Sequence, residues 1–221
     1  VYPLHFSPGE EKELLMVFYK PGSSIEIPVY LWSPAAFGYR DYIYNLGYGA
    51  FFGFIAICFL ASAISYIILK RVLHLWYTLY VLSVFLYVLA NLGLAFQWLY
   101  PQTTDLNSII HVSLSVIIFI FFCKFSQAFL PYRESLPRVN ATLNGISYYF
   151  LASIFIGAAT YPAVKQISVY WLPVNYGIML VGHVLVVMGA VYLVRKHRQD
   201  ATLYLISIFI LFSFGSLQVL R

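Results

Sequence analysis

The fold is decided by residues 42–69, which read YIYNLGYGAFFGFIAICFLASAISYIIL and contain no Asp, Glu, Lys or Arg. About 20 apolar residues in a helix are enough to cross the ~30 Å hydrocarbon core of a bilayer. Tyr42, Tyr44 and Tyr48 at the start of the stretch are typical of the headgroup region. Residues 42–69 therefore predict a transmembrane helix.

Similar uncharged stretches recur to the end of the chain. They cover 72–104, 106–123, 139–164, 166–194 and 201–220. Only 10% of the 221 residues are charged and 62% are hydrophobic, whereas a soluble domain has about 25% charged residues. Within lipid, only helices and closed barrels satisfy their own backbone, and runs this long without alternation favour helices. We expect an all-α polytopic membrane bundle with six spans, at roughly 44–69, 73–99, 107–130, 141–161, 172–194 and 201–220.

Residues 1–41 differ from this pattern and are expected to be the end of an extracytoplasmic β domain. Two β-prone runs flank the turn Lys20-Pro21-Gly22-Ser23-Ser24, and the second run alternates apolar and polar residues over 25–32. This pattern predicts a β-hairpin over 13–32. Because two strands alone are marginally stable in water, the hairpin should belong to a larger sheet or contact a partner. The transmembrane domain would then occupy 42–221.

Positive charge alternates between the gaps that separate the spans. The gaps after the first, third and fifth spans hold seven basic residues, and the other gaps hold only Lys165. The seven are Lys70, Arg71, Arg133, Arg138, Arg195, Lys196 and Arg198. Basic loops stay in the cytoplasm, so we expect a periplasmic N-terminus in a bacterial inner membrane.

Three polar residues in the spans are candidates for a ligand-binding site: Asn91, His111 and His183. Ionisable groups within the membrane are costly and often functional. Each also has a structural interpretation, because a neutral His or an amide can simply hydrogen-bond a neighbouring helix. Lys124 lies near the end of its span, where its long side chain can extend to the headgroups.

No motif in this chain indicates catalysis, a metal or a cofactor. Phosphate-binding glycine loops and the patterns HExxH and GxSxG are all missing, and Cys58 and Cys123 have no metal-site spacing. We therefore expect no enzyme activity in this segment, no cofactor and no metal. None of the eight acidic residues lies in the middle of a span, which argues against an ion-coupled transporter.

The order of features resembles the bacterial seven-transmembrane receptors with diverse intracellular signalling modules. The similar segments are Leu31 to Phe37 (LWSPAAF), Tyr42 to Gly53, Tyr77 to Tyr80, and Gly93 to Tyr100. The resemblance implies a sensor whose seventh span leads to a cytoplasmic output module. That span and the output would lie beyond Arg221, and most of the β domain would precede Val1.

The leading hypothesis is thus a transmembrane receptor segment that passes a periplasmic signal to an output module. The alternatives are an accessory or structural subunit of a larger membrane complex, or a transporter component. We expect the lipid bilayer, a second copy or a membrane complex, and an unidentified periplasmic ligand as partners. Nucleic acid is not expected, since the basic residues are confined to the gaps between spans.

The charge asymmetry predicts which loops face the cytoplasm. Cysteines placed at Thr104 and Ser135 should differ in labelling by a membrane-impermeant reagent in intact cells. The label should reach position 104 and not position 135. The opposite pattern would invert the topology and remove the basis for the receptor hypothesis.

Overall fold

The structure is a computed structural model of the chain. It describes residues 30–99, 104–164, 168–196 and 201–206, together with Leu4, 7–11, Glu13, Leu15, Met16 and Gln199. The side chains of 104–109, 158–164 and 168–172 are not among those described.

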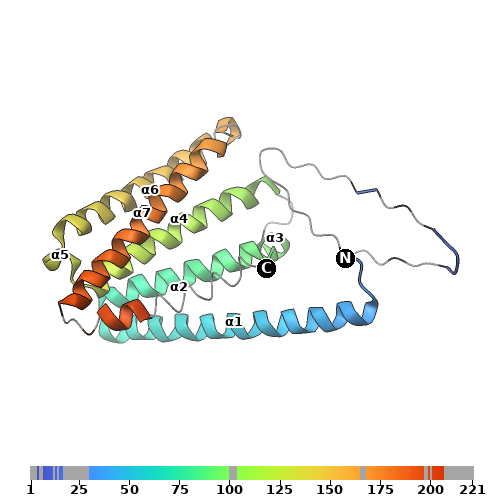
Figure 1. Cartoon of the computed structure of the whole chain (residues 1–221), viewed down its shortest axis with the longest axis horizontal. Coiled ribbons are helices and arrows are strands. Elements are labelled where there is room, and N and C mark those ends of the chain that lie inside the picture. The colour runs from blue at the N-terminus through green and yellow to red at the C-terminus, as the bar shows by residue number, and fades with distance from the viewer. Residues whose placement is uncertain are drawn as a thin grey trace.

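From Pro34 onward, the described part of the chain is mostly helical (Figure 1). Its elements are α1 (Pro34–Leu69), α2 (Val72–Asn91), α3 (Leu94–Trp98), α4 (Thr104–Phe129), α5 (Tyr132–Ser135), α6 (Pro137–Val164) and α7 (Ser168–Arg195). Residues 201–206 are also helical. Five of these helices, α1, α2, α4, α6 and α7, contain segments long and apolar enough to cross a membrane. The expected polytopic helical bundle is confirmed, whereas the count of six spans is not, because 207–220 of the sixth lie outside the described residues.

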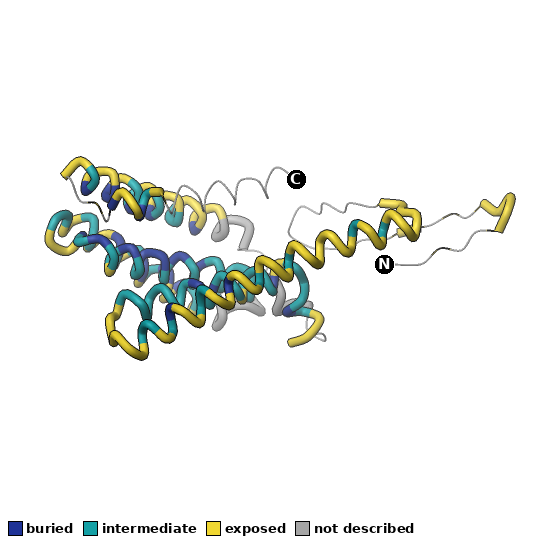
Figure 2. Tube along the Cα trace, turned by 90° about the horizontal axis from the view of Figure 1, so that it is seen from below, coloured by how far each residue is buried: buried dark blue, intermediate teal, exposed yellow. Residues whose placement is uncertain are grey.

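Helix α4 lies at the centre of the bundle. It contacts α2 on one side and the pair α6 and α7 on the other, and α1 packs against α2 (Figure 1). Buried positions gather on α4 and its neighbours, while α1 is exposed along most of its length (Figure 2). Since the exposed side chains of α1 are largely Ile, Leu and Phe, they suit contact with acyl chains.

Most of the described basic residues gather at one end of the bundle. Lys70 and Arg71 join α1 to α2, Arg133 and Arg138 lie in α5 and the first turn of α6, and Arg195 ends α7. These helix ends lie together at the left of Figure 1. We call this the basic end.

Helix α1 begins at Pro34, before the span start expected at 44, and the domain boundary at 41/42 stays a prediction. Ser33 caps the helix, with its Oγ accepting a hydrogen bond from the Ala36 N–H at 3.3 Å. Proline suits the first helical position because its missing N–H would have no helical partner there. The segment Leu31 to Phe37 therefore contains a helix start that the apolar pattern alone did not reveal.

The N-terminal segment meets α1 through a cluster of aromatic rings around Arg40. Its guanidinium carbon lies 5.7, 4.7 and 5.1 Å from the ring centroids of Tyr30, Trp32 and Tyr44. The β-hairpin expected over 13–32 is not confirmed. Its described residues, Glu13, Leu15, Met16 and 30–32, are neither strand nor helix, and the others lie outside the described residues.

The second predicted span, 73–99, is divided into two helices. Helix α2 ends at Asn91, and Gly93 adopts a left-handed φ of 73° before α3 begins at Leu94. The Leu92 and Gly93 N–H groups donate to the carbonyls of Val88 and Ala90, both at 3.0 Å. Gly93 lacks the Cβ that makes this conformation costly for other residues. The prediction of one continuous helix was wrong at this point.

The fifth span, expected at 172–194, matches the candidate membrane segment Pro173–Arg195, although Pro173 itself lies inside a longer helix. Helix α7 starts at Ser168 and continues through Pro173. Proline removes one backbone donor from the helix interior. The helix tolerates this loss in its second turn.

Replacing Gly93 with alanine should destabilise the bundle by about 1–2 kcal/mol, because an L-residue in the left-handed region carries that cost. Gly145 is a matched control, since it is helical and a Cβ there meets nothing within 4 Å. Gly145→Ala should be neutral or slightly stabilising. Unfolding by SDS titration from mild detergent measures both, and equal stability of the two variants would contradict the role given to Gly93.

Candidate functional site

His183 lies in the bundle interior, where α7 meets α4. Its ring centroid is 5.0 Å from that of Phe119 and 5.1 Å from that of Phe122, and the ring stacks on Phe122 at 23°. Its Nδ1 lies 2.8 Å from the Met179 carbonyl oxygen, one turn earlier in α7. The ring is therefore fixed both by packing and by its own helix.

Glycine brings α7 close to α4 beside this histidine. A Cβ on Gly182 would overlap the Phe119 ring. Phe119 itself is buried and packs edge-on against Phe150 of α6 at 5.3 Å. Small residues allow helices to approach in this way in membranes, so Gly182 sets the distance between α4 and α7.

Tyr132 of α5 packs into the bundle interior near the basic end. Its side chain is fully buried, at 0% exposure, and its hydroxyl donates to the Val186 carbonyl oxygen at 2.6 Å. A Cβ on Gly189 would overlap its ring. Burial, with a smaller contribution from Cys123, raises the pKa of Tyr132. The hydroxyl therefore stays protonated and can donate this bond at any physiological pH.

A second tyrosine connects α4 to the helical segment 201–206. The Tyr204 hydroxyl hydrogen-bonds Ser126 of α4, whose own hydroxyl lies 2.7 Å from the Phe122 carbonyl. Because Ser126 donates to that carbonyl, Tyr204 is the donor to Ser126. The Tyr204 ring also stacks on Phe129, with centroids 5.6 Å apart. This contact joins the centre of the bundle to the segment that follows α7.

A polar cluster joins α4 to α6 near the basic end. Lys124 Nζ donates to Asn144 Oδ1 at 2.6 Å. Gln127 Nε2 lies 3.0 Å from the Asn140 carbonyl, 2.9 Å from Asn140 Oδ1 and 3.3 Å from Asn144 Oδ1. We call Lys124, Gln127, Asn140 and Asn144 the donor cluster. The Lys124 side chain, which was expected to extend to the headgroups, bonds Asn144 of α6 near the basic end.

The three predicted ligand residues do not form one site. Asn91 is the exposed last residue of α2, and the half-buried His111 packs edge-on against Tyr87 with centroids 6.0 Å apart. His183 packs against Phe119 and Phe122, at least about 12 Å further along α4 from His111 at 1.5 Å per residue. Their roles as ligand residues remain predictions.

Sequence reasoning missed Tyr132, Ser126 and Tyr204. Tyr132 lies between two helices and so shows no periodicity, and serine and tyrosine in apolar runs are ordinary. Gly182 and Gly189 around His183 were the available signal for a close helix contact.

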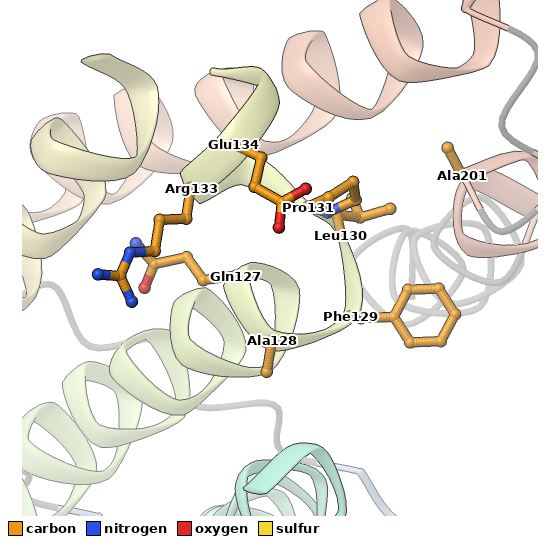
Figure 3. Close-up of a pocket in the computed structure, with 8 residues that line it drawn as sticks. All are labelled: Gln127, Ala128, Phe129, Leu130, Pro131, Arg133, Glu134 and Ala201. Atoms are coloured by element: carbon orange, nitrogen blue, oxygen red, sulfur yellow. The ribbon is translucent and has the colours of Figure 1, made fainter. Parts of the chain in front are cut away.

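A cavity of about 290 Å³ opens beside the donor cluster (Figure 3). Gln127 comes from α4, Arg133 and Glu134 from α5, and Ala201 from the segment after α7. The remaining lining residues are Ala128, Phe129, Leu130 and Pro131. Within the part of the chain that the structure describes, no group of three or more His, Cys, Asp or Glu side chains could hold a metal.

Apolar helices that pack through glycine contacts and enclosed polar bonds define a polytopic helical membrane protein. The chain belongs to the 7TM diverse intracellular signalling family, whose model matches residues 44–221. This match confirms the family indicated by the resemblance. Neither the curated proteins nor the solved structures include a match to this chain.

The contact between Gly182 and Phe119 makes a prediction about stability. Gly182→Ala should destabilise the bundle by about 1–3 kcal/mol, because the added methyl forces the ring or the helix to move. Gly177→Ala, in the same helix with open space around its Cβ, should leave stability nearly unchanged. Thermal unfolding in detergent compares them, and a Gly182→Ala protein as stable as the Gly177→Ala protein would refute the close contact.

Proposed function

We propose that this chain is the membrane domain of a bacterial inner-membrane receptor that passes a periplasmic signal to a cytoplasmic output module outside the chain. The observation that carries the proposal is membership of the 7TM diverse intracellular signalling family over 44–221. We also propose that the receptor binds a ligand and that it associates with a second copy or with another membrane complex. This segment is proposed to have no catalytic activity.

The proposed orientation rests on charge. Six described basic residues gather at one end of the bundle, and such ends stay in the cytoplasm. They are Lys70, Arg71, Arg133, Arg138, Arg195 and Lys196. With this end in the cytoplasm, the N-terminal segment and the Arg40 ring cluster lie on the periplasmic side.

Helix α4 offers a route for the signal. It contacts α2, α6 and α7, and its Ser126 bonds Tyr204 of the segment that follows α7. A ligand can act only through different affinities for two arrangements of the bundle. A shift of α4 would reach the segment after α7 directly through Tyr204.

The break between α2 and α3 does not favour a transporter. Transporter sites use helices broken near the bilayer midplane. Gly93 lies instead at the end of α2 away from Arg71 and the basic end.

The Ser126–Tyr204 bond should matter for signalling if this route is used. An interhelical hydrogen bond in a membrane averages ~0.6 kcal/mol, so losing it from one of two states shifts their ratio about threefold. Tyr204→Phe and Ser126→Ala should therefore change the basal expression of the genes that respond to deletion of the protein. Tyr192→Phe, on the exposed surface of α7, is the matched control.

Membrane levels of all variants are measured alongside expression, to separate signalling from folding. Both bond-removing variants should reach wild-type levels and still shift output in the same direction. A deletion strain that differs only in the abundance of another membrane complex would instead support the accessory-subunit alternative.

A further inference from the structure

We infer that the donor cluster and the adjacent exposed face of α6 bind an anionic phospholipid in the leaflet at the basic end. Hydrogen-bond capacity, charge, depth and the direction of an apolar strip on α6 all point to such a ligand, independently of the proposed receptor function.

The donor cluster has more donors than acceptors. Asn140 Oδ1 and Asn144 Oδ1 both accept bonds within the cluster, from Gln127 or Lys124. In the described part of the chain, the amide NH₂ groups of both asparagines have no acceptor, and Lys124 uses only one of its three protons. The side-chain acceptor capacity left over is Gln127 Oε1 and one lone pair of Asn140 Oδ1, which is fewer than the donors left over. A ligand rich in hydrogen-bond acceptors would pair with these unused donors.

The cluster also carries an uncompensated positive charge. Among the described residues, no carboxylate forms an ion pair with Lys124; its contacts are the Asn144 oxygen and the Tyr148 ring, whose centroid lies 5.6 Å from Nζ. A cation within a membrane span is expensive without a partner. An anionic ligand would supply both the missing charge and the missing acceptors.

The depth of the cluster matches that of a phospholipid headgroup. Lys124 lies about 8 Å from the end of α4 at Phe129, at 1.5 Å per residue. Asn140 and Asn144 lie in the first two turns of α6, which starts at Pro137. Both helices therefore present the cluster just inside the basic end, where phosphate oxygens meet the acyl region.

An apolar strip runs away from the cluster along α6. Tyr148, Leu151 and Phe155 are 67%, 47% and 69% exposed. They lie on one helix face with Asn144, which is one turn nearer the basic end. The order from polar cluster to apolar strip is that of phosphate and acyl chain in one lipid. A free phosphate would use the cluster and leave the strip unexplained.

Binding is measured with the purified protein in nonionic detergent, by native mass spectrometry. It is titrated with phosphatidylglycerol and with phosphatidylcholine of the same chains. The wild-type protein should prefer phosphatidylglycerol. Because one basic residue near anionic lipid is worth about fivefold in binding, Lys124→Gln should lower the affinity for phosphatidylglycerol about fivefold and leave phosphatidylcholine binding unchanged.

Lys196→Gln is the matched control. Lys196 also lies at the basic end over a tyrosine, 4.9 Å from the Tyr192 centroid, but is not part of the donor cluster. It should keep the wild-type preference. Equal losses from Lys124→Gln and Lys196→Gln, or no preference in the wild type, would overturn the inference.

Asn144→Asp provides a second test that preserves the local geometry. The new carboxylate would pair with Lys124 in place of the amide, so the protein should fold while the site becomes neutral. Preference for phosphatidylglycerol should fall as with Lys124→Gln, and a retained preference would refute the site. Inorganic phosphate should not displace the lipid at equal concentration; displacement would assign the cluster to a free anion instead.

Discussion

Close packing around α4 is the constraint on which the rest of this structure depends. In lipid, apolar side chains gain little by leaving acyl chains for one another, so helices associate through contact and hydrogen bonds. Gly182 and Gly189 let Phe119 and Tyr132 reach the backbone of α7. The buried core accordingly follows α4, α6 and α7, while α1 remains largely exposed.

Polar groups within the bundle follow the same constraint. Ser65 and Ser147 return their hydroxyls to carbonyls one turn earlier, and Thr78 reaches across to Ser62 of α1. The hydroxyls of Tyr132 and Tyr204 are also hydrogen-bonded, each to a residue of another helix. The donor cluster departs from this constraint, because its groups leave donors and a charge unmatched by the described chain. This difference separates structural polar groups from a surface suited to a ligand.

The two proposals place different demands on the basic end. A receptor needs a contact there that can change. The contact of Tyr204 with α4 consists of one hydrogen bond to Ser126 and the stacking of its ring on Phe129. A bound lipid would instead rest on α4 and α6, where Gln127 belongs to the donor cluster and also lines the cavity that Ala201 lines. Both surfaces include residues of α4.

The sequence by itself determined the class of fold, since the backbone in lipid must be helical and long uncharged runs suffice to locate helices. It also determined the family and the gathering of basic residues at one end, which follows from counting loops. Helix ends required local geometry: the Ser33 cap, the left-handed Gly93 and the continuation through Pro173 depend on dihedral angles that hydropathy does not encode. Only the tertiary structure decided that His111 and His183 lie apart, that Tyr132 enters the core and that Lys124 meets Asn144. Those outcomes depend on which helix faces meet, and that choice is made by packing between residues distant in the chain.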